Sequence, residues 1–315
     1  MVVMLQFKKV RLQRGTKVLL EDTSAALPND CICGLIGRNG AGKSSLMSVL
    51  QGDLQLDGGV IDMPPQWRLA YLEQELPTHS EKVIDFVCAG DKEWQEIQQK
   101  LAQAEATEDG MAIAEAYASL QAIDAYTLPA RAATVLHGLG FRQSDLERDI
   151  QDFSGGWQMR MQLARVLLSR ADCVLLDEPT NHLDFESIIY LEQWLAEYHG
   201  CSIIISHDRD FLDRVTTHTL YLAQQQLALY VGNYTAFQRQ FQEKLILQGK
   251  MAVKIEKKRA HMQSFVDRFK AKASKAKQAQ SRVKALEKLQ FSADLVDESS
   301  FHFNFFNCDT VGYPA

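Results

Sequence analysis

The 315-residue sequence contains no uninterrupted apolar run of the roughly 18 to 20 residues that a membrane-spanning helix requires. Its first ten residues, MVVMLQFKKV, lack the layout of a signal peptide. No two cysteines have C-x-x-C spacing, which argues against a disulfide framework or a zinc finger. The six cysteines are Cys31, Cys33, Cys88, Cys173, Cys201 and Cys308. We therefore expect a cytoplasmic protein with reduced thiols and no membrane span.

Cys31 and Cys33 are two residues apart and would share one face of a strand. A metal pair is one interpretation of this spacing, and packing in the core is the other. We favour core packing, because no second pair of ligands follows in the sequence.

Basic residues are concentrated in one segment. The formal net charge is −6, but residues 244–290 hold 14 Lys and Arg against three acidic residues. That segment therefore carries +11, and the rest of the chain carries −17. An acidic body with a concentrated basic arm suggests that the arm meets a polyanion.

The apolar pattern predicts an α/β domain over residues 1–235. Residues 5–27 alternate around a central glycine, as the strands of an antiparallel hairpin do. The runs at 31–37, 173–176 and 201–205 are almost continuously apolar, which is typical of strands buried on both faces of a parallel sheet. Between about 83 and 140, residues with helical spacing predict a helical insertion.

Residues 236–292 contain no proline and a single glycine, Gly249. With abundant Ala, Lys, Gln and Arg, this composition predicts long helices. We expect a basic helical hairpin over 236–292 that bends near 270–277.

A phosphate-binding loop is predicted between the first buried strand and the helix after it. The pattern G-x-x-x-x-G-K-S is matched by Gly37, Arg38, Asn39, Gly40, Ala41, Gly42, Lys43 and Ser44. Glycines let backbone N–H groups surround phosphates at a helix N-terminus, where anions are favoured. A chance match in a glycine-rich turn is the alternative, and the strand and helix on either side argue against it.

Two further segments are candidates for chemistry. Asp177 and Glu178 close the strand CVLLDE, which places carboxylates at the sheet edge near the loop, although such a pair is often just a solvated strand end. Ser154, Gly155 and Gly156 precede a helix, so Ser154 can cap it with its side chain while the glycine amides face outward. An ordinary capped helix is the alternative.

The order of these segments resembles ABC ATPases. SGG comes first, followed by LLDEPTNHLD and then ISHDRDFLD; the NHLD and SHDRDFL sequences resemble the ABC-F subfamily. The basic segment 267–289 is similar to that of the YheS-type bacterial branch, and the resemblance extends to about residue 305. It implies an α/β fold: a P-loop ABC ATPase domain with an antiparallel β subdomain and a helical subdomain, followed by the basic helical hairpin.

The resemblance also implies roles for residues in binding and hydrolysing ATP with Mg²⁺. Residues 37–45, which include Ser45, form the Walker A loop, and Gln74 belongs to the Q-loop that senses Mg²⁺ and the γ-phosphate. Ser44 and Asp177 hold Mg²⁺, Glu178 polarises the attacking water, and His207 is the switch histidine. His207 alone is more simply a packed or surface histidine, and the flanking SHDRDFLD favours the catalytic role.

Ser154, Gly155 and Gly156 match the signature that caps the nucleotide of a facing domain, and Asp184 matches the D-loop. Two positions depart from the family. Trp157 stands where the signature has glutamine, and Arg14 stands where an aromatic residue usually lies under the adenine. A guanidinium can stack on a base, so ATP remains the expected ligand, with weak base discrimination.

The basic segment resembles the linker that ABC-F proteins extend toward transfer RNA on the ribosome, which implies ribosomal and transfer RNA as partners. The residues expected to meet RNA phosphates are Arg268, Lys270, Lys272, Lys275, Lys277, Arg282 and Lys284. A solvated charged helix is the alternative, and the excess of positive charge argues against it.

Two other functions stay open: a nucleotide-binding subunit of a membrane transporter, and an inactive half-length remnant. Each motif occurs once, whereas ABC sites are shared between two domains, so we expect a second domain by dimerisation or in a longer chain. Residues 300–305 look like the first strand of that second domain, and we expect 293–315 to be its truncated or divergent start.

Overall fold

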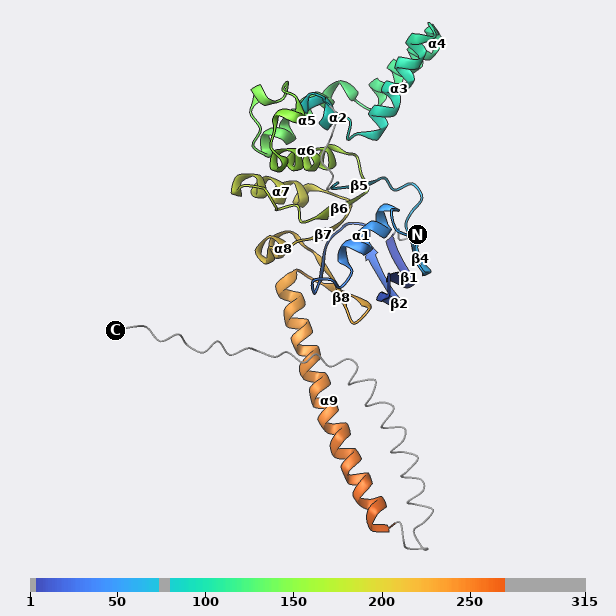
Figure 1. The fold of residues 1–315 in the computed structure, drawn as a ribbon, viewed down its shortest axis with the longest axis vertical. Helices are drawn as coiled ribbons and strands as arrows, with labels where there is room; N and C mark the ends of the chain where they lie inside the picture. Colours follow the sequence, from blue (N-terminus) through green and yellow to red (C-terminus); the bar gives the residue numbers. More distant parts are fainter. Residues whose placement is uncertain (1–3, 74–79, 270–315) are drawn as a thin grey trace, which may run out of the picture. The chain divides into compact units, whose positions relative to one another are not determined.

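The computed structural model describes residues 4–73 and 80–269 (Figure 1). The chain divides into two units, Met1–Phe237 and Gln238–Ala315. The first unit contains every strand of the described residues and eight of their nine α-helices. The ninth, α9, begins at Tyr234 and continues into the second unit.

The centre of the first unit is a six-stranded sheet in the order β5-β6-β7-β3-β8-β9. Five of the strands are parallel, and β9 pairs antiparallel with β8. The strands are β3 (Cys31–Gly37), β5 (Leu69–Tyr71), β6 (Cys173–Asp177), β7 (Cys201–Ile205), β8 (His218–Ala223) and β9 (Gln226–Val231). The carboxyl ends of β3 and β6 therefore meet at one edge, which is where open α/β sheets bind ligands.

Both faces of this sheet are buried, which explains the nearly continuous apolar runs. Along β6, Val174 and Leu176 face one core cluster, which also contains residues of α2, α5, α6, α7 and α8. Cys173 and Leu175 face the opposite cluster, which contains residues of α1 and of the β1–β2 hairpin.

Cys31, Cys33, Cys173 and Cys201 belong to the second of these clusters. Cys31 and Cys201 are paired across β3 and β7, with their Sγ atoms 3.8 Å apart. A hydrogen bond with Cys201 and burial both raise the pKa of the Cys31 thiol. These thiols pack in the core among apolar side chains.

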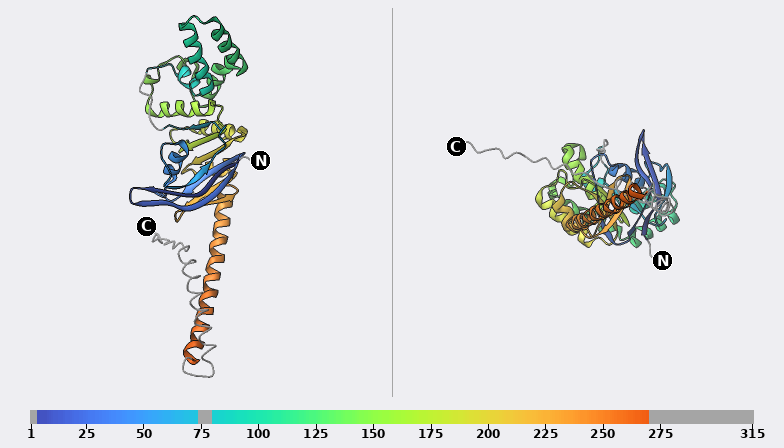
Figure 2. Two further views of the ribbon diagram at one scale, coloured as in Figure 1. Left: turned by 90° about the vertical axis from the view of Figure 1, so that its right-hand side faces the viewer. Right: turned by 90° about the horizontal axis from the view of Figure 1, so that it is seen from below.

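A three-stranded antiparallel sheet in the order β2-β1-β4 covers that cluster. Its strands are β1 (Met4–Arg14), β2 (Lys17–Pro28) and β4 (Gly58–Asp62). It is linked to the central sheet near the turn between β8 and β9, where the Glu21 N–H donates to the Gln225 carbonyl at 2.9 Å. Figure 2 shows the β1–β2 hairpin beside the central sheet.

Helices cover the remaining surfaces of the first unit. They are α1 (Lys43–Gln51), α2 (Val83–Cys88), α3 (Lys92–Ala106), α4 (Gly110–Ala122), α5 (Leu128–Gly138), α6 (Gly155–Leu168), α7 (Phe185–Glu197) and α8 (Arg209–Val215). Helices α2 to α6 gather at one end of the unit (Figure 1), and α3 and α4 share a small core of their own. Helices α2 to α5 lie between Val83 and Gly138.

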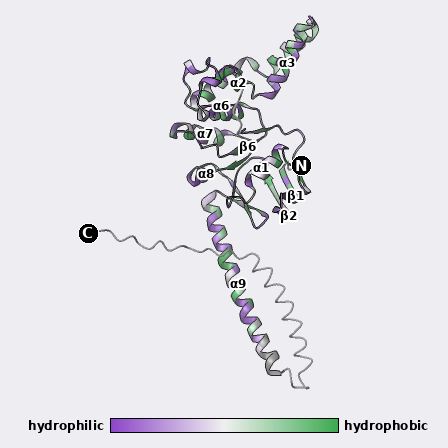
Figure 3. Cartoon of the chain, viewed as in Figure 1, coloured by the Kyte–Doolittle hydropathy of each residue, from purple (hydrophilic) through white to green (hydrophobic). Residues whose placement is uncertain are grey.

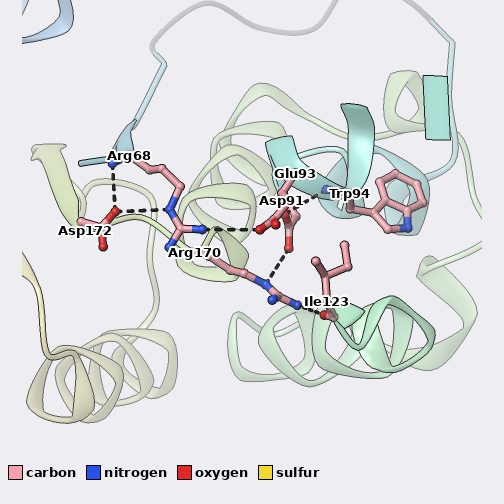
Figure 4. A network of polar contacts seen from close by, with 7 residues as sticks. All are labelled: Arg68, Asp91, Glu93, Trp94, Ile123, Arg170 and Asp172. Carbon is pink, nitrogen blue, oxygen red and sulfur yellow. Dashed lines mark hydrogen bonds and ion pairs between the residues drawn. The ribbon is translucent and has the colours of Figure 1, made fainter. Parts of the chain in front are cut away.

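Polar contacts hold α3 to the rest of the helical part (Figure 4). The Asp91 side chain is only 2% exposed, caps α3 through the Trp94 N–H, and pairs with Arg170 at 3.1 Å. Arg170 also donates to the Ile123 carbonyl. Removing one partner of a buried ion pair leaves an uncompensated charge. The Asp91–Arg170 pair therefore holds the start of α3, and with it the α3–α4 hairpin, in place.

The described part of the second unit is the continuation of α9 (Tyr234–Phe269). Hydrophilic and hydrophobic residues are mixed along it (Figure 3), and Lys250, Lys254, Lys257 and Lys258 are exposed. In the part of the chain that the structure describes, no helix is both long and apolar enough to cross a membrane. The expected bend, the second hairpin helix and residues 293–315 lie outside the described residues.

Candidate nucleotide site

The predicted phosphate loop joins β3 to α1 at the carboxyl edge of the central sheet. A Cβ on Gly37 would lie 2.5 Å from the Leu222 carbonyl oxygen, and Gly42 has φ 113°, so both positions require glycine. Helix α1 has no side-chain cap. Its first N–H groups are therefore available to an anion.

Lys43 folds back over this loop. Its Nζ donates to the Gly37 carbonyl at 3.0 Å and to the Arg38 carbonyl at 3.4 Å. Arg38, Asn39 and Gly40 are exposed at the tip of the loop. Two further loop residues, Ala41 and Ser45, are half-buried and buried respectively. The loop thus presents one ammonium and several backbone donors.

Asp177 ends β6 beside this loop and accepts a hydrogen bond from the Ser44 hydroxyl. Burial raises the pKa of the Asp177 carboxyl, and the hydrogen bond with Ser44 and the electrostatic interactions with Lys43 and His207 partly offset that rise. A hydroxyl beside a carboxylate is an oxygen donor set that suits Mg²⁺, which proteins commonly bind with one or two carboxylates plus substrate phosphates. No cluster of three or more metal-ligating His, Cys, Asp or Glu exists among the described residues. Waters and substrate oxygens are the usual further ligands of Mg²⁺ at sites of this kind.

Asp177→Asn should raise the thermal stability of the ligand-free protein near pH 7 while weakening Mg²⁺-dependent nucleotide binding. The pKa of Asp177 is higher in the folded chain than in the unfolded chain. The contribution of Asp177 to the free energy of unfolding is therefore complete below the unfolded pKa, where the carboxyl is neutral, and is lost as the pH rises through the folded pKa. Asparagine stays neutral at every pH and avoids this loss. Melting curves at several pH values measure this, and the difference from the parent should shrink toward acid pH. The exposed Asp210→Asn serves as control; a less stable Asp177→Asn at pH 7 contradicts the prediction.

Glu178 follows Asp177 in an unusual backbone conformation, with φ 50°. Its N–H donates to the Ile205 carbonyl at 2.8 Å, and its Oε2 accepts from the His207 N–H at 3.1 Å. Its Oε1 is buried, has no hydrogen bond, and lies 3.5 Å from His207 Nε2. The structure thus brings together Glu178 and His207, two of the three predicted catalytic residues, and leaves one carboxylate oxygen for a further donor.

Ser154 occupies the N-cap position of α6, but its side chain makes no capping hydrogen bond. The expected side-chain cap is therefore wrong: only the Ser154 carbonyl is used, accepting from the Gln158 N–H at 3.0 Å. Ser154 and Gly155 are exposed, and Gly156 faces His182 of the loop after β6. The hydroxyl and the first amides of α6 remain available for an external ligand.

Arg160 of α6 joins this segment to the loop that ends at Asp184. Its Nη1 lies 2.8 Å from Asp184 Oδ2, and its Nε donates to the His182 carbonyl at 2.8 Å. Asp184 also caps α7 by accepting from the Ser187 N–H, and this hydrogen bond and the Arg160 contact hold the pKa of Asp184 below its usual value. The Arg160 guanidinium also lies 4.5 Å from the centre of the Trp157 ring. Trp157, which stands where the family signature has glutamine, thus packs against Arg160.

Sequence reasoning did not identify Arg160 or Lys17 as part of the site. Lys17 Nζ donates to the Gly40 carbonyl at 2.6 Å, opposite Arg14, whose Nη1 lies 3.5 Å from Ser45 Oγ. The two-residue turn after Arg14 could have identified Lys17, because it places these two residues directly across the hairpin.

For several predicted site residues, the structure gives no side-chain position. Gln74 lies outside the described residues, and so do Lys270, Lys272, Lys275, Lys277, Arg282 and Lys284. Arg268 falls within α9.

This fold has a counterpart among solved structures. The structure of an ATP-binding subunit of an ABC transporter superposes with a TM-score of 0.57 at 19% identity, covering 76% of this chain and 93% of that one. The phosphate loop, the carboxylates after β6 and the two subdomains define an ABC-type nucleotide-binding domain. The expected fold class is thereby confirmed for the first unit.

Family models described as ABC transporter match residues 20–181 and 220–303. An Escherichia coli K12 protein named "Probable ATP-binding protein YheS" is 44% identical over 302 residues, 96% of this chain and 47% of that protein. Human ATP-binding cassette sub-family F member 3 is 36% identical, over 87% of this chain and 39% of that protein. The chain belongs to the ABC family and to its ABC-F subfamily, and it spans less than half the length of these relatives.

Proposed function

We propose that this chain binds ATP with Mg²⁺, hydrolyses it together with a second ABC domain, and acts on the ribosome in the cytoplasm. Nucleotide binding is supported by the residues that lie together at one edge of the central sheet. Lys43 lies in the phosphate loop, and Ser44 hydrogen-bonds Asp177. Family membership supports it, since YheS relatives are named as ATP-binding proteins.

Within this proposal each residue has a physical task. Lys43 and the amides of α1 bind the phosphates, and Ser44 with Asp177 holds Mg²⁺. Bound Mg²⁺ supplies positive charge that neutralises the phosphate oxygens. Glu178 accepts the proton of the attacking water through its buried, unbonded Oε1, and His207 orients that carboxylate. We propose Gln74 as a further residue near Mg²⁺ and the γ-phosphate.

A second domain is part of the proposal because some of the predicted residues face outward. Ser154 and Gly155 are exposed at the start of α6, and Arg160 ties this helix to Asp184. Outward-facing amides at a helix N-terminus suit a phosphate presented by another domain. The second domain would come from another copy or from the remainder of a longer protein.

The ribosome part rests on charge. Residues 244–290 carry +11 within an otherwise acidic chain, and the lysines of the described part of α9 are exposed. Such a segment binds phosphate backbones with little sequence preference. We propose that it contacts ribosomal and transfer RNA near the exit site through Arg268 and the six basic residues that follow it.

Ribosome co-sedimentation with and without ATP tests this part. Replacing Arg268, Lys270, Lys272, Lys275 and Lys277 with glutamine should abolish co-sedimentation, because each neutralised phosphate contributes to a salt-dependent affinity, while ATP binding stays unchanged. In variants with a single one of these replacements, the log–log salt slope should fall by about one for the lost contact.

The control for this experiment removes equal charge elsewhere. It replaces the exposed residues Lys8, Lys9, Arg11, Lys92 and Lys100 with glutamine and should co-sediment like the parent. If the segment variant still sediments with ribosomes at the same salt concentration, the basic segment is a solvated spacer. Sedimentation with membranes instead would favour the transporter alternative.

A further inference from the structure

A pocket of about 310 Å³ lies between the β1–β2 turn and the phosphate loop. Three cations line it, namely Arg14, Lys17 and Lys43, together with Leu19 and the small residues of the loop. None of the described residues that line it is aromatic or acidic. The pocket therefore offers concentrated positive charge and no ring on which a base could stack.

The backbone fixes Arg14 and Lys17 opposite each other. They are direct partners in the β1–β2 ladder, joined by a two-residue turn in which Gly15 has φ 61°. Glycine at the first turn position allows a tight connection whose twist matches the strands. Both side chains consequently leave the hairpin at its tip, beside the loop.

Each side chain is then held against a different part of the loop. Lys17 Nζ donates to the Gly40 carbonyl at 2.6 Å. The Arg14 guanidinium lies 3.5 Å from Ser45 Oγ, in the first turn of α1. Leu19 packs below them against Gly42, where a Cβ would approach its side chain to 3.1 Å. The two cations therefore flank the amides that bind phosphate, and Arg14 is drawn toward the loop.

We propose that Arg14 and Lys17 determine specificity by contacting the phosphates, so that the site selects a triphosphate with Mg²⁺ and discriminates little between bases. This inference rests on the proposed nucleotide function. Guanidinium and ammonium groups make charge-assisted hydrogen bonds to phosphate oxygens. Among the described residues that line this pocket, a base meets no aromatic ring and no carboxylate acceptor that would distinguish adenine from guanine or cytosine.

Calorimetry with Mg²⁺ and ATP, GTP, CTP or inorganic tripolyphosphate tests the inference. The dissociation constants of the three nucleotides should agree within about threefold, because the discriminating contacts are to phosphate. Arg14→Gln should weaken the binding of all four ligands by about tenfold, tripolyphosphate included, and Lys17→Gln should act in the same direction. Arg11→Gln removes an exposed arginine of the same strand that does not line the pocket, and should leave all four constants unchanged.

Two results would overturn the inference while leaving the nucleotide function intact. One is binding of ATP more than tenfold tighter than both GTP and CTP. The other is an Arg14→Gln variant that loses nucleotide affinity but keeps its affinity for tripolyphosphate, which would show that Arg14 contacts the base. If none of the four ligands binds the parent chain, the proposed nucleotide function fails, and this inference fails with it.

Discussion

Lys43→Ala should lower the affinity for ATP and Mg²⁺ by at least about a hundredfold, since it removes two or more charged hydrogen bonds to phosphate. Lys43 Nζ is held 3.0 Å from the Gly37 carbonyl, inside the loop whose backbone amides would surround the phosphates. A nucleotide entering the variant would bring its phosphates to that loop without this charge. Calorimetry on the purified chain measures the loss directly.

The folded state should survive this substitution. Lys43 is half-buried at the start of α1, and the helix is anchored by Leu46, Met47 and Leu50 in the core. The melting temperature without nucleotide should therefore change little. Lys8→Ala, which removes a surface lysine paired with Asp62 at 2.7 Å, controls for the loss of one positive charge. An unchanged ATP affinity in Lys43→Ala would remove the phosphate-loop assignment.

Local patterns predicted the central sheet and the phosphate loop because each depends on neighbouring residues. The predicted strand 201–205 agrees with β7 (Cys201–Ile205), since a strand with two buried faces must be apolar throughout. Gly42 was predictable because the loop needs φ 113° there. Loops of this kind carry much of their geometry in their own sequence.

Contacts between distant segments were not predictable in the same way. Arg160 and Asp184 are 24 residues apart, and only the packing of α6 beside the loop after β6 brings them together. Ser154 was expected to cap α6 because serine commonly does so, yet capping depends on a side-chain rotamer that the sequence does not specify. Lys17 approaches Gly40 only because the hairpin folds over the loop.

The same distinction applies to charge. The sequence indicates that residues 244–290 are basic, whereas the low exposure of Asp91 and its pairing with Arg170 follow from the helical packing alone. A buried pair of this kind positions the base of α3, and an exposed basic helix is free to meet a polyanion. The concentrated positive charge of residues 244–290 therefore predicts a polyanionic partner. The low exposure of Asp91 indicates a structural role for its pair with Arg170.

Glu178→Gln should preserve ATP binding and slow hydrolysis by about a hundredfold or more, which is the usual contribution of a general base. Glutamine keeps the shape of the side chain, and its carbonyl oxygen can still accept from the His207 N–H, as Glu178 Oε2 does at 3.1 Å. An amide cannot take up a proton, however, and Glu178 Oε1 is the buried carboxylate oxygen without a hydrogen bond at this site.

Phosphate release should be measured at the protein concentration at which turnover by the parent is highest, so that a second copy can complete the site. Calorimetry on the same samples should give an ATP dissociation constant within about threefold of the parent value, because the binding contacts of Lys43 and Asp177 are kept. Glu197→Gln, an exposed substitution at the end of α7, should leave both quantities unchanged. Turnover by Glu178→Gln at the parent rate would mean that another residue activates the water, and the role assigned to Glu178 would have to be given up.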